Sequence, residues 1–109
     1  MGGKGRKKGA STTLLDGEAR ERSRRTGKKL VKGKVSRRGN TVVINAGGSP
    51  IPVGAGRAKS LLAALENPKL RGKPVTIPVS SPPPARLVRL SPVEIRKAVA
   101  LARQVGLLA

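Results

Sequence analysis

Apolar and polar residues alternate along two parts of this chain, which is the pattern of half-buried β-strands. Between residues 29 and 46, Val31 and Val35 alternate with lysines, a Ser-Arg-Arg-Gly-Asn turn follows at 36–40, and the run Thr-Val-Val-Ile-Asn comes next. This arrangement predicts a β-hairpin. Between residues 73 and 80, Val and Ile alternate with Pro and Thr. Proline lacks the N–H that a central strand needs, so we expect an edge strand or an extended surface segment there.

Two further segments repeat apolar residues at helical spacing. Ala and Leu at positions i, i+3, i+4 and i+7 predict a helix over about 57–66, which an Asn-Pro pair ends. The clearest signal is a C-terminal helix over about 92–105, because Ser91 is a preferred N-cap residue and Pro92 suits the first helical position. Glu94 lies three residues after Ser91 and completes the sequence of a capping box.

The composition argues against a large, stable core. None of the 109 residues is Phe, Tyr or Trp, and these side chains usually dominate core burial. A chain of this length also buries a smaller fraction of its surface than a longer one, and its high charge approaches the composition of disordered proteins. We therefore predict a mostly irregular or extended chain with little regular structure: a basic disordered N-terminal arm, a short hairpin, and two short helices at about 57–66 and 92–105. It is not expected to be an independently stable globule.

Positive charge dominates the chain, since 24 residues are Lys or Arg and only 5 are Asp or Glu, for a formal net charge of +19. Such a chain is drawn to nucleic acid by the release of condensed counterions. Residues 1–40 are interpreted as a Gly-rich nucleic-acid-binding arm with a short helix from about Asp16 to Arg25, and residues 41–109, which contain all nine prolines, as an anchoring segment. The candidate nucleic-acid contacts are the basic residues of the arm: Lys4, Arg6, Lys7, Lys8, Arg20, Arg22, Arg24, Arg25, Lys28, Lys29, Lys32, Lys34, Arg37 and Arg38.

The residue inventory excludes several classes of function. Without Cys or His, the chain lacks the usual ligands of a structural zinc site, and we expect no metal and no cofactor. Without aromatic rings, it cannot grip single strands by stacking, so its contacts should be electrostatic and largely independent of base sequence. The five carboxylates are dispersed, so no catalytic residues and no small-molecule substrate are expected. No apolar run is long enough for a signal peptide or a membrane span.

The apolar residues of the second half are predicted to bind another protein. The C-terminal helix also carries Arg96, Lys97 and Arg103, which could face nucleic acid instead. Its apolar face is wide and its charges are few, so docking of this helix into a protein groove is the preferred interpretation. The predicted docking residues are Leu61, Leu62, Leu65, Ile95, Val99, Ala102, Leu107 and Leu108.

The first ten residues, Met-Gly-Gly-Lys-Gly-Arg-Lys-Lys-Gly-Ala, resemble the start of the small basic DNA-packaging proteins of microviruses, which are icosahedral single-stranded-DNA phages. The resemblance implies that the arm neutralises a packaged genome through Lys4, Arg6, Lys7 and Lys8, while the C-terminal part lies against the inner capsid surface. This chain is longer than the proteins of that family and lacks their C-terminal aromatic residues, which leaves the mode of docking open.

On this basis we predict a non-enzymatic, minor structural protein of a virion, located in the virion interior and in the host cytoplasm during assembly. Its expected partners are packaged nucleic acid, taken to be single-stranded DNA, and the major capsid protein or other assembly subunits. Two alternatives use the same residues differently. One is a ribosomal protein or rRNA-binding factor, and the other is a capsid cement or minor coat protein without nucleic-acid contact.

Overall fold

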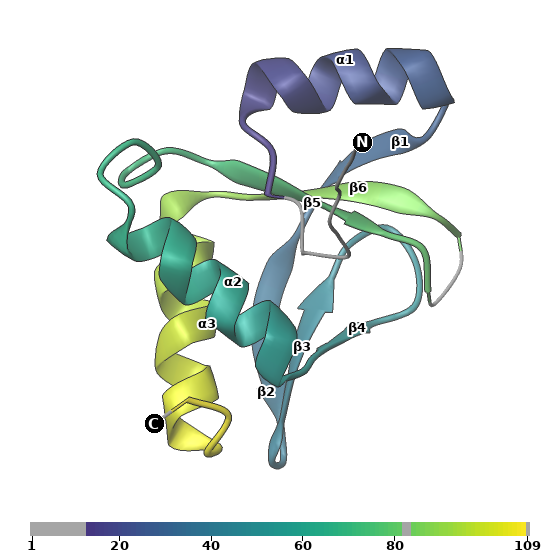
Figure 1. The fold of residues 1–109 in the computed structure, drawn as a ribbon. Helices are drawn as coiled ribbons and strands as arrows, with labels where there is room; N and C mark the ends of the chain where they lie inside the picture. Colours follow the sequence, from purple (N-terminus) through teal and green to yellow (C-terminus); the bar gives the residue numbers. More distant parts are fainter. Residues whose placement is uncertain (1–12, 82–83, 109) are drawn as a thin grey trace, which may run out of the picture.

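The structure, a computed structural model, describes residues 13–81 and 84–108, which form helices and strands in a mixed order (Figure 1). Along the chain these elements are α1 (Asp16–Thr26), β1 (Lys29–Lys32), β2 (Lys34–Arg38), β3 (Thr41–Asn45), β4 (Ile51–Val53), α2 (Ala55–Glu66), β5 (Val75–Val79), β6 (Arg86–Leu90) and α3 (Pro92–Gln104). The strands form a first sheet in the order β1-β6-β5 and a second sheet in the order β2-β3-β4. β1 runs parallel to β6, and the other neighbouring strands are antiparallel.

The helices pack on the sheets from two sides. α1 packs on β1 and β5 of the first sheet. α3 packs on β2 and β3 of the second sheet, and α2 packs on α3 and β4. In Figure 1, α1 lies across the top of the first sheet, while α2 and α3 lie together below it. The core therefore lies between the two sheets and the α2–α3 pair, and α1 covers the opposite face of the first sheet.

An aliphatic core joins the two sheets to α2 and α3. The strands supply mainly β-branched residues, which pack well on a pleated surface, and the helices supply several alanines that let backbones approach closely. The buried members of this cluster are Val35, Val42, Ile44, Ala46, Ile51, Val53, Ala58, Leu61, Ala64, Val75, Ile77, Val79, Val88, Leu90, Ile95, Ala98, Val99 and Ala102. Under α1, Ala19 and Leu87 are also fully buried, on the other face of the first sheet.

Gly33 joins β1 to β2 and lets one extended segment pass from the first sheet into the second. Its backbone N–H donates to the carbonyl oxygen of Arg89 at 2.8 Å. A Cβ atom at this position would lie 2.6 Å from Cγ1 of Val88 and 2.9 Å from Cγ2 of Ile44. The strand can therefore cross the core at this point only because residue 33 has no side chain.

The prediction of a mostly irregular chain that is not an independently stable globule is wrong. The described residues fold into two sheets and three helices around one core. The Cα radius of gyration is 13.7 Å, close to the roughly 13 Å of a folded domain of this length. The physical reason is that Val, Ile, Leu and Ala fill the interior without aromatic help, while the cationic side chains lie mostly on the surface.

Several predicted elements are confirmed. The helices expected near 57–66 and 92–105 are α2 and α3, the helix expected near 16–25 is α1, and the segment 73–80 contains β5, an edge strand of the first sheet. The predicted hairpin is confirmed in part. β2 and β3 form it, but its turn is only Gly39, whose φ is 60°, and Asn40, because residues 36–38 belong to β2. Residues 29–32 were expected in the hairpin but form β1, which pairs with β6. β4 and β6 were not predicted. The proposed division between residues 40 and 41 falls in this turn, and strands from both sides pair across it.

The expected capping box of α3 is formed only in part. Ser91 caps the helix, because its Oγ accepts the backbone N–H of Glu94 at 3.3 Å. The Glu94 carboxylate binds elsewhere, since it accepts the backbone N–H of Val35 at 2.7 Å. Leu90 and Ile95, on either side of the cap, are both buried in the core. The helix therefore starts where predicted, and its acidic residue serves the neighbouring strand.

Candidate nucleic-acid interface

Three cationic side chains form a row on one side of the β1–β2 segment. Residues alternate through the bend: Gly33 and Val35 are buried, whereas Lys32, Lys34 and Arg38 are exposed. Alternate residues of a strand lie on the same face, about 6.6 Å apart at 3.3 Å per residue. Lys32, Lys34 and Arg38 therefore point outward together, and we call them the outer row. Lys32 and Lys34 are separated by one such step, and Lys34 and Arg38 by two steps, about 13 Å.

The outer face of the second sheet continues this surface. α3 packs on the opposite face, because its buried residues belong to the same core as Val35 and Ile44. The outer face carries polar side chains, among them Ser36, whose Oγ accepts a hydrogen bond from Nδ2 of Asn45 at 3.0 Å. The same face also carries Val43, which is 6% exposed, and its register partner Pro52, so the outer row borders a surface of mixed polar and apolar residues.

At the other end of the outer row, Arg89 of β6 lies beside Lys32. The two residues are register partners in the parallel pair β1–β6, so their side chains share one face of the first sheet. Asp16, the first residue of α1, accepts two hydrogen bonds from Arg89, at 3.0 Å from Nε and 3.1 Å from Nη2. The hydrogen bond from Arg89 is the main cause that holds the pKa of Asp16 below its ordinary value of 3.8, and the charge of Arg20 acts in the same direction. Of the two neighbouring positive charges, those of Lys32 and Arg89, Asp16 therefore neutralises the one on Arg89.

A pocket of about 240 Å³ lies beside the bend at Gly33. Its lining mixes both signs of charge, because Glu94 faces it together with the cationic residues. The lining residues are Lys32, Gly33, Lys34, Arg89, Ser91 and Glu94.

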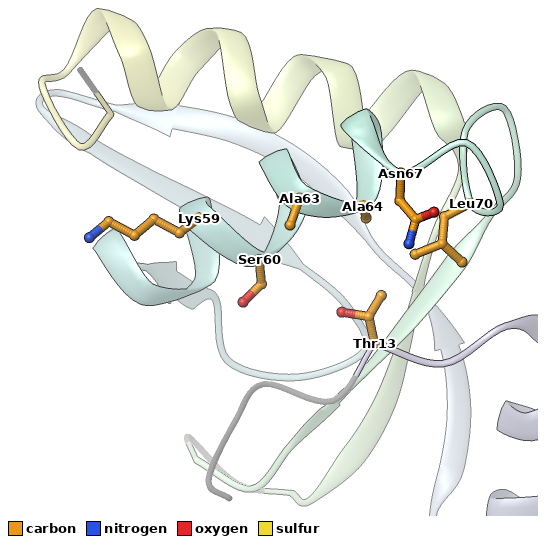
Figure 2. Close-up of a pocket in the computed structure, with 7 residues that line it drawn as sticks. All are labelled: Thr13, Lys59, Ser60, Ala63, Ala64, Asn67 and Leu70. Atoms are coloured by element: carbon orange, nitrogen blue, oxygen red, sulfur yellow. The ribbon is translucent and has the colours of Figure 1, made fainter. Parts of the chain in front are cut away.

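A second pocket, of about 320 Å³, lies against α2 (Figure 2). Figure 2 shows Lys59 extending away from Thr13, Asn67 and Leu70, and Lys59 is the one charged residue of the lining. This pocket therefore has no charge cluster that would favour nucleic acid. Its lining residues are Thr13, Lys59, Ser60, Ala63, Ala64, Asn67 and Leu70.

The predicted nucleic-acid residues divide into several groups in space. On α1, Arg20, Arg24 and Arg25 are exposed and Arg22 is half-buried. Arg37 is held at the hairpin end, where its Nε donates to the carbonyl oxygen of Gly39 at 2.7 Å and its Nη1 donates to Oε1 of Gln104 at 3.1 Å. The structure therefore brings Lys32, Lys34 and Arg38 together and separates Arg37 from them. Lys4, Arg6, Lys7 and Lys8 lie outside the described residues.

Two further predicted contacts, Lys28 and Lys29, line a third pocket, of about 350 Å³. Two arginines that the sequence analysis did not select also line pockets: Arg86 lines this third pocket, and Arg89 lines the pocket beside Gly33. The available signal was two arginines within the otherwise apolar run Arg-Leu-Val-Arg-Leu. That run does not alternate, but once it is paired as β6 its residues three positions apart lie on opposite faces, so Arg86 and Arg89 do as well.

The predicted docking residues lie in or against the core of this chain. Leu61, Ile95, Val99 and Ala102 are at most 3% exposed. The others are partly buried and pack against the same core: Leu62, Leu65, Leu107 and Leu108. Packing within the chain therefore accounts for the apolar pattern that suggested a protein partner.

Comparison of the chain with protein-family models, with curated proteins and with solved structures finds no match. The helices described within 13–81 and 84–108 are too short or too polar to cross a bilayer. Within the same ranges, no three His, Cys, Asp or Glu side chains gather as candidate metal ligands. The cationic surface is thus the feature on which a functional proposal can be built.

Proposed function

We propose that this protein binds the phosphate backbone of nucleic acid, without base specificity, through the outer row and the cationic residues around it. The observation that carries the proposal is the common orientation of Lys32, Lys34 and Arg38 on one extended segment. Cations that point outward from one extended segment can contact phosphates of the same strand, and such contacts position the strand without reading its bases.

The charge balance supports the same proposal. Within the part of the chain that the structure describes, Asp16–Arg89 is the one ion pair between side chains. Most surface cations are therefore available to replace the counterions of a polyanion. The exposed Arg20 and Arg24 lie four residues apart on α1, so they share one side of that helix and widen the cationic surface.

The setting that we propose for this binding is genome packaging inside an icosahedral virion. It rests on the resemblance of residues 1–10, and binding to ribosomal RNA would use the same surface. The buried docking residues favour a folded module that binds nucleic acid over an extended chain spread across capsid protein. Co-purification with virions or with ribosomes separates the two settings.

The proposal is tested by the salt dependence of binding to a labelled single-stranded oligonucleotide. For single strands, log affinity falls with log salt at a slope of about −0.7 per phosphate contact. The triple variant K32Q/K34Q/R38Q should therefore reduce the slope by about 2. The matched control K59Q/K69Q/K97Q removes the same charge from α2, the following loop and α3. Equal effects of the two variants, or no binding by the native protein at low salt, would refute the outer row as the binding surface.

A further inference from the structure

Arg89 of β6 is paired with an anion that belongs to the protein itself. The carboxylate of Asp16 accepts two hydrogen bonds from the guanidinium of Arg89, at 3.0 Å from Nε and 3.1 Å from Nη2. Guanidinium groups bind phosphates in the same two-bonded arrangement as carboxylates. The side chains of Arg89 and Asp16 are 32% and 33% exposed, so an anion from solution can reach the pair.

Arg89 also lines the pocket of about 240 Å³ at the bend between β1 and β2. Lys32, its register partner in β1, and Lys34 of the outer row line the same pocket. Asp16 does not belong to that lining and, within the described residues, is ion-paired with Arg89 and with neither lysine. A phosphate in the pocket would therefore meet three cations, whereas Asp16 pairs with only one of them.

Glu94 is the one carboxylate that lines this pocket, and it is engaged with the backbone. Its Oε1 accepts the N–H of Val35 at 2.7 Å. Within the part of the chain that the structure describes, no ion pair joins Glu94 to the cations of the lining. Three cationic side chains and one carboxylate give the lining itself a net charge of +2, which favours an added anion.

The Asp16 side chain can leave Arg89 while α1 stays on the first sheet. Leu14, two residues before Asp16, exchanges two backbone hydrogen bonds with Thr76 of β5, at 2.8 and 2.7 Å. Ala19 holds the first turn of the helix, because it is fully buried. Rotation of the Asp16 side chain alone therefore separates the pair. The released carboxylate remains at the N-terminus of α1, where the helix dipole favours negative charge.

We propose that Asp16 occupies Arg89 in place of a backbone phosphate and yields this position when a nucleic-acid strand binds. Arg89 is then a further phosphate-binding residue of the cationic surface. The carboxylate of Asp16 competes with the phosphate and weakens binding by the native protein. The inference rests on the proposed function, because the anion that replaces Asp16 is a phosphate of the strand that lies on the outer row.

The first test compares Asp16→Asn with Glu21→Gln in binding to a labelled single-stranded oligonucleotide at low salt. Both variants remove one negative charge from α1, but only Asp16→Asn breaks the ion pair with Arg89. Asp16→Asn should therefore bind at least about threefold more tightly than Glu21→Gln, which is the size expected for a partly exposed pair. Equal affinities of the two variants would overturn the inference.

The salt dependence of the same binding distinguishes exchange from permanent masking. If Asp16 yields to a phosphate, native protein and Asp16→Asn form the same number of phosphate contacts, so log affinity should fall with log salt at the same slope. A slope steeper by about 0.7 in Asp16→Asn alone would mean that the native carboxylate stays on Arg89 in the complex. That result would overturn the exchange.

The second test asks whether the gain in affinity acts through Arg89. In protein that carries Arg89→Gln, the further change Asp16→Asn should raise affinity no more than Glu21→Gln does. Because the ion pair is partly exposed, its loss should leave the fold intact, which circular dichroism checks. A gain that persists undiminished in the Arg89→Gln background would assign the effect to the charge of α1 and overturn the role of Arg89.

Failure of this inference differs from failure of the proposed function. Equal affinities of Asp16→Asn and Glu21→Gln, with an oligonucleotide that the native protein binds, would overturn the inference alone. Absence of oligonucleotide binding by native protein and by Asp16→Asn at low salt would refute the proposed function, and the inference with it.

Discussion

The carboxylate of Glu94 accepts a hydrogen bond from the backbone N–H of Val35 at 2.7 Å, across 59 positions of the sequence. Two residues earlier, at the junction of β1 and β2, the N–H of Gly33 donates to the carbonyl oxygen of Arg89, the penultimate residue of β6. β6 ends at Leu90 and cannot supply an acceptor for the N–H of Val35. The carboxylate of Glu94 in α3 takes that place. The Glu94 side chain thus accepts a backbone N–H at the edge of the β1–β2 segment, where the chain passes from the first sheet to the second.

This relationship predicts unequal effects of two substitutions at position 94. Glu94→Ala leaves the N–H of the buried Val35 without its acceptor, which should lower the free energy of unfolding by about 1–3 kcal/mol. Glu94→Gln keeps an oxygen acceptor and should cost clearly less. Urea unfolding followed by circular dichroism measures both. Equal losses for the two variants would show that the hydrogen bond to Val35 is not what Glu94 contributes.

A second prediction concerns the crossing point at Gly33. Gly33→Ala places a Cβ atom 2.6 Å from Val88 and 2.9 Å from Ile44 and Leu90, so core side chains must shift. We expect a loss of about 3 kcal/mol, at the upper end of overpacking effects. Gly56→Ala is the matched control, because nothing lies within 4 Å of a Cβ there and residue 56 is in α2. It should stabilise by about 0.4–1 kcal/mol. The same sign for both variants in urea unfolding would contradict the crossing model.

The local features of this fold could be predicted from the sequence, because each depends on neighbouring residues. The hairpin follows from alternation and a Gly-Asn turn, and the start of α3 follows from Ser91 and Pro92. β6 was missed because a five-residue run between a proline segment and an N-cap has no distinctive local signal, and its partner β1 lies more than 50 residues away. The absence of aromatic residues does not prevent a core from forming, since aliphatic side chains alone fill it.

The candidate site also combines features that the local sequence predicts with features that depend on pairing between distant segments. The common orientation of Lys32 and Lys34 is visible in the alternation of the sequence. The pairing of Lys29 with Arg86 depends on the register between β1 and β6, and the ion pair of Asp16 with Arg89 spans 73 positions. No periodicity along the chain could have placed those charges side by side.

A third prediction is the acid dependence of the Asp16–Arg89 ion pair. The pKa of Asp16 is lowered in the folded protein from 3.8, chiefly by the hydrogen bond from Arg89. The carboxylate therefore contributes fully above the unfolded-state pKa, and its contribution is lost as the pH falls through the lower folded-state pKa. Because the pair is partly exposed, Asp16→Asn should cost at most about 1 kcal/mol near neutral pH. The difference between native protein and variant in urea unfolding should shrink progressively as the pH is lowered below 3.8.

Glu21→Gln serves as the control for this measurement. It removes an exposed carboxylate from the same helix without breaking an ion pair. Its unfolding free energy should stay close to the native value across the pH range. A difference between native protein and Asp16→Asn that persists unchanged at pH 2 would argue against an electrostatic role for Asp16.

A fourth prediction distinguishes the contribution of the N-terminal arm to nucleic-acid binding from that of the folded surface. Deleting residues 1–12 removes Lys4, Arg6, Lys7 and Lys8 and leaves intact the pairing described from the Leu14–Thr76 bridge onward, so we expect the unfolding midpoint to be retained. If the arm contacts phosphates, the salt slope for single-stranded DNA should fall by up to about 3, at 0.7 per contact. A full-length variant with these four residues changed to Gln should reproduce the effect, because charge and not length is responsible. An unchanged slope in both variants would assign binding to the folded surface and remove the packaging role inferred from residues 1–10.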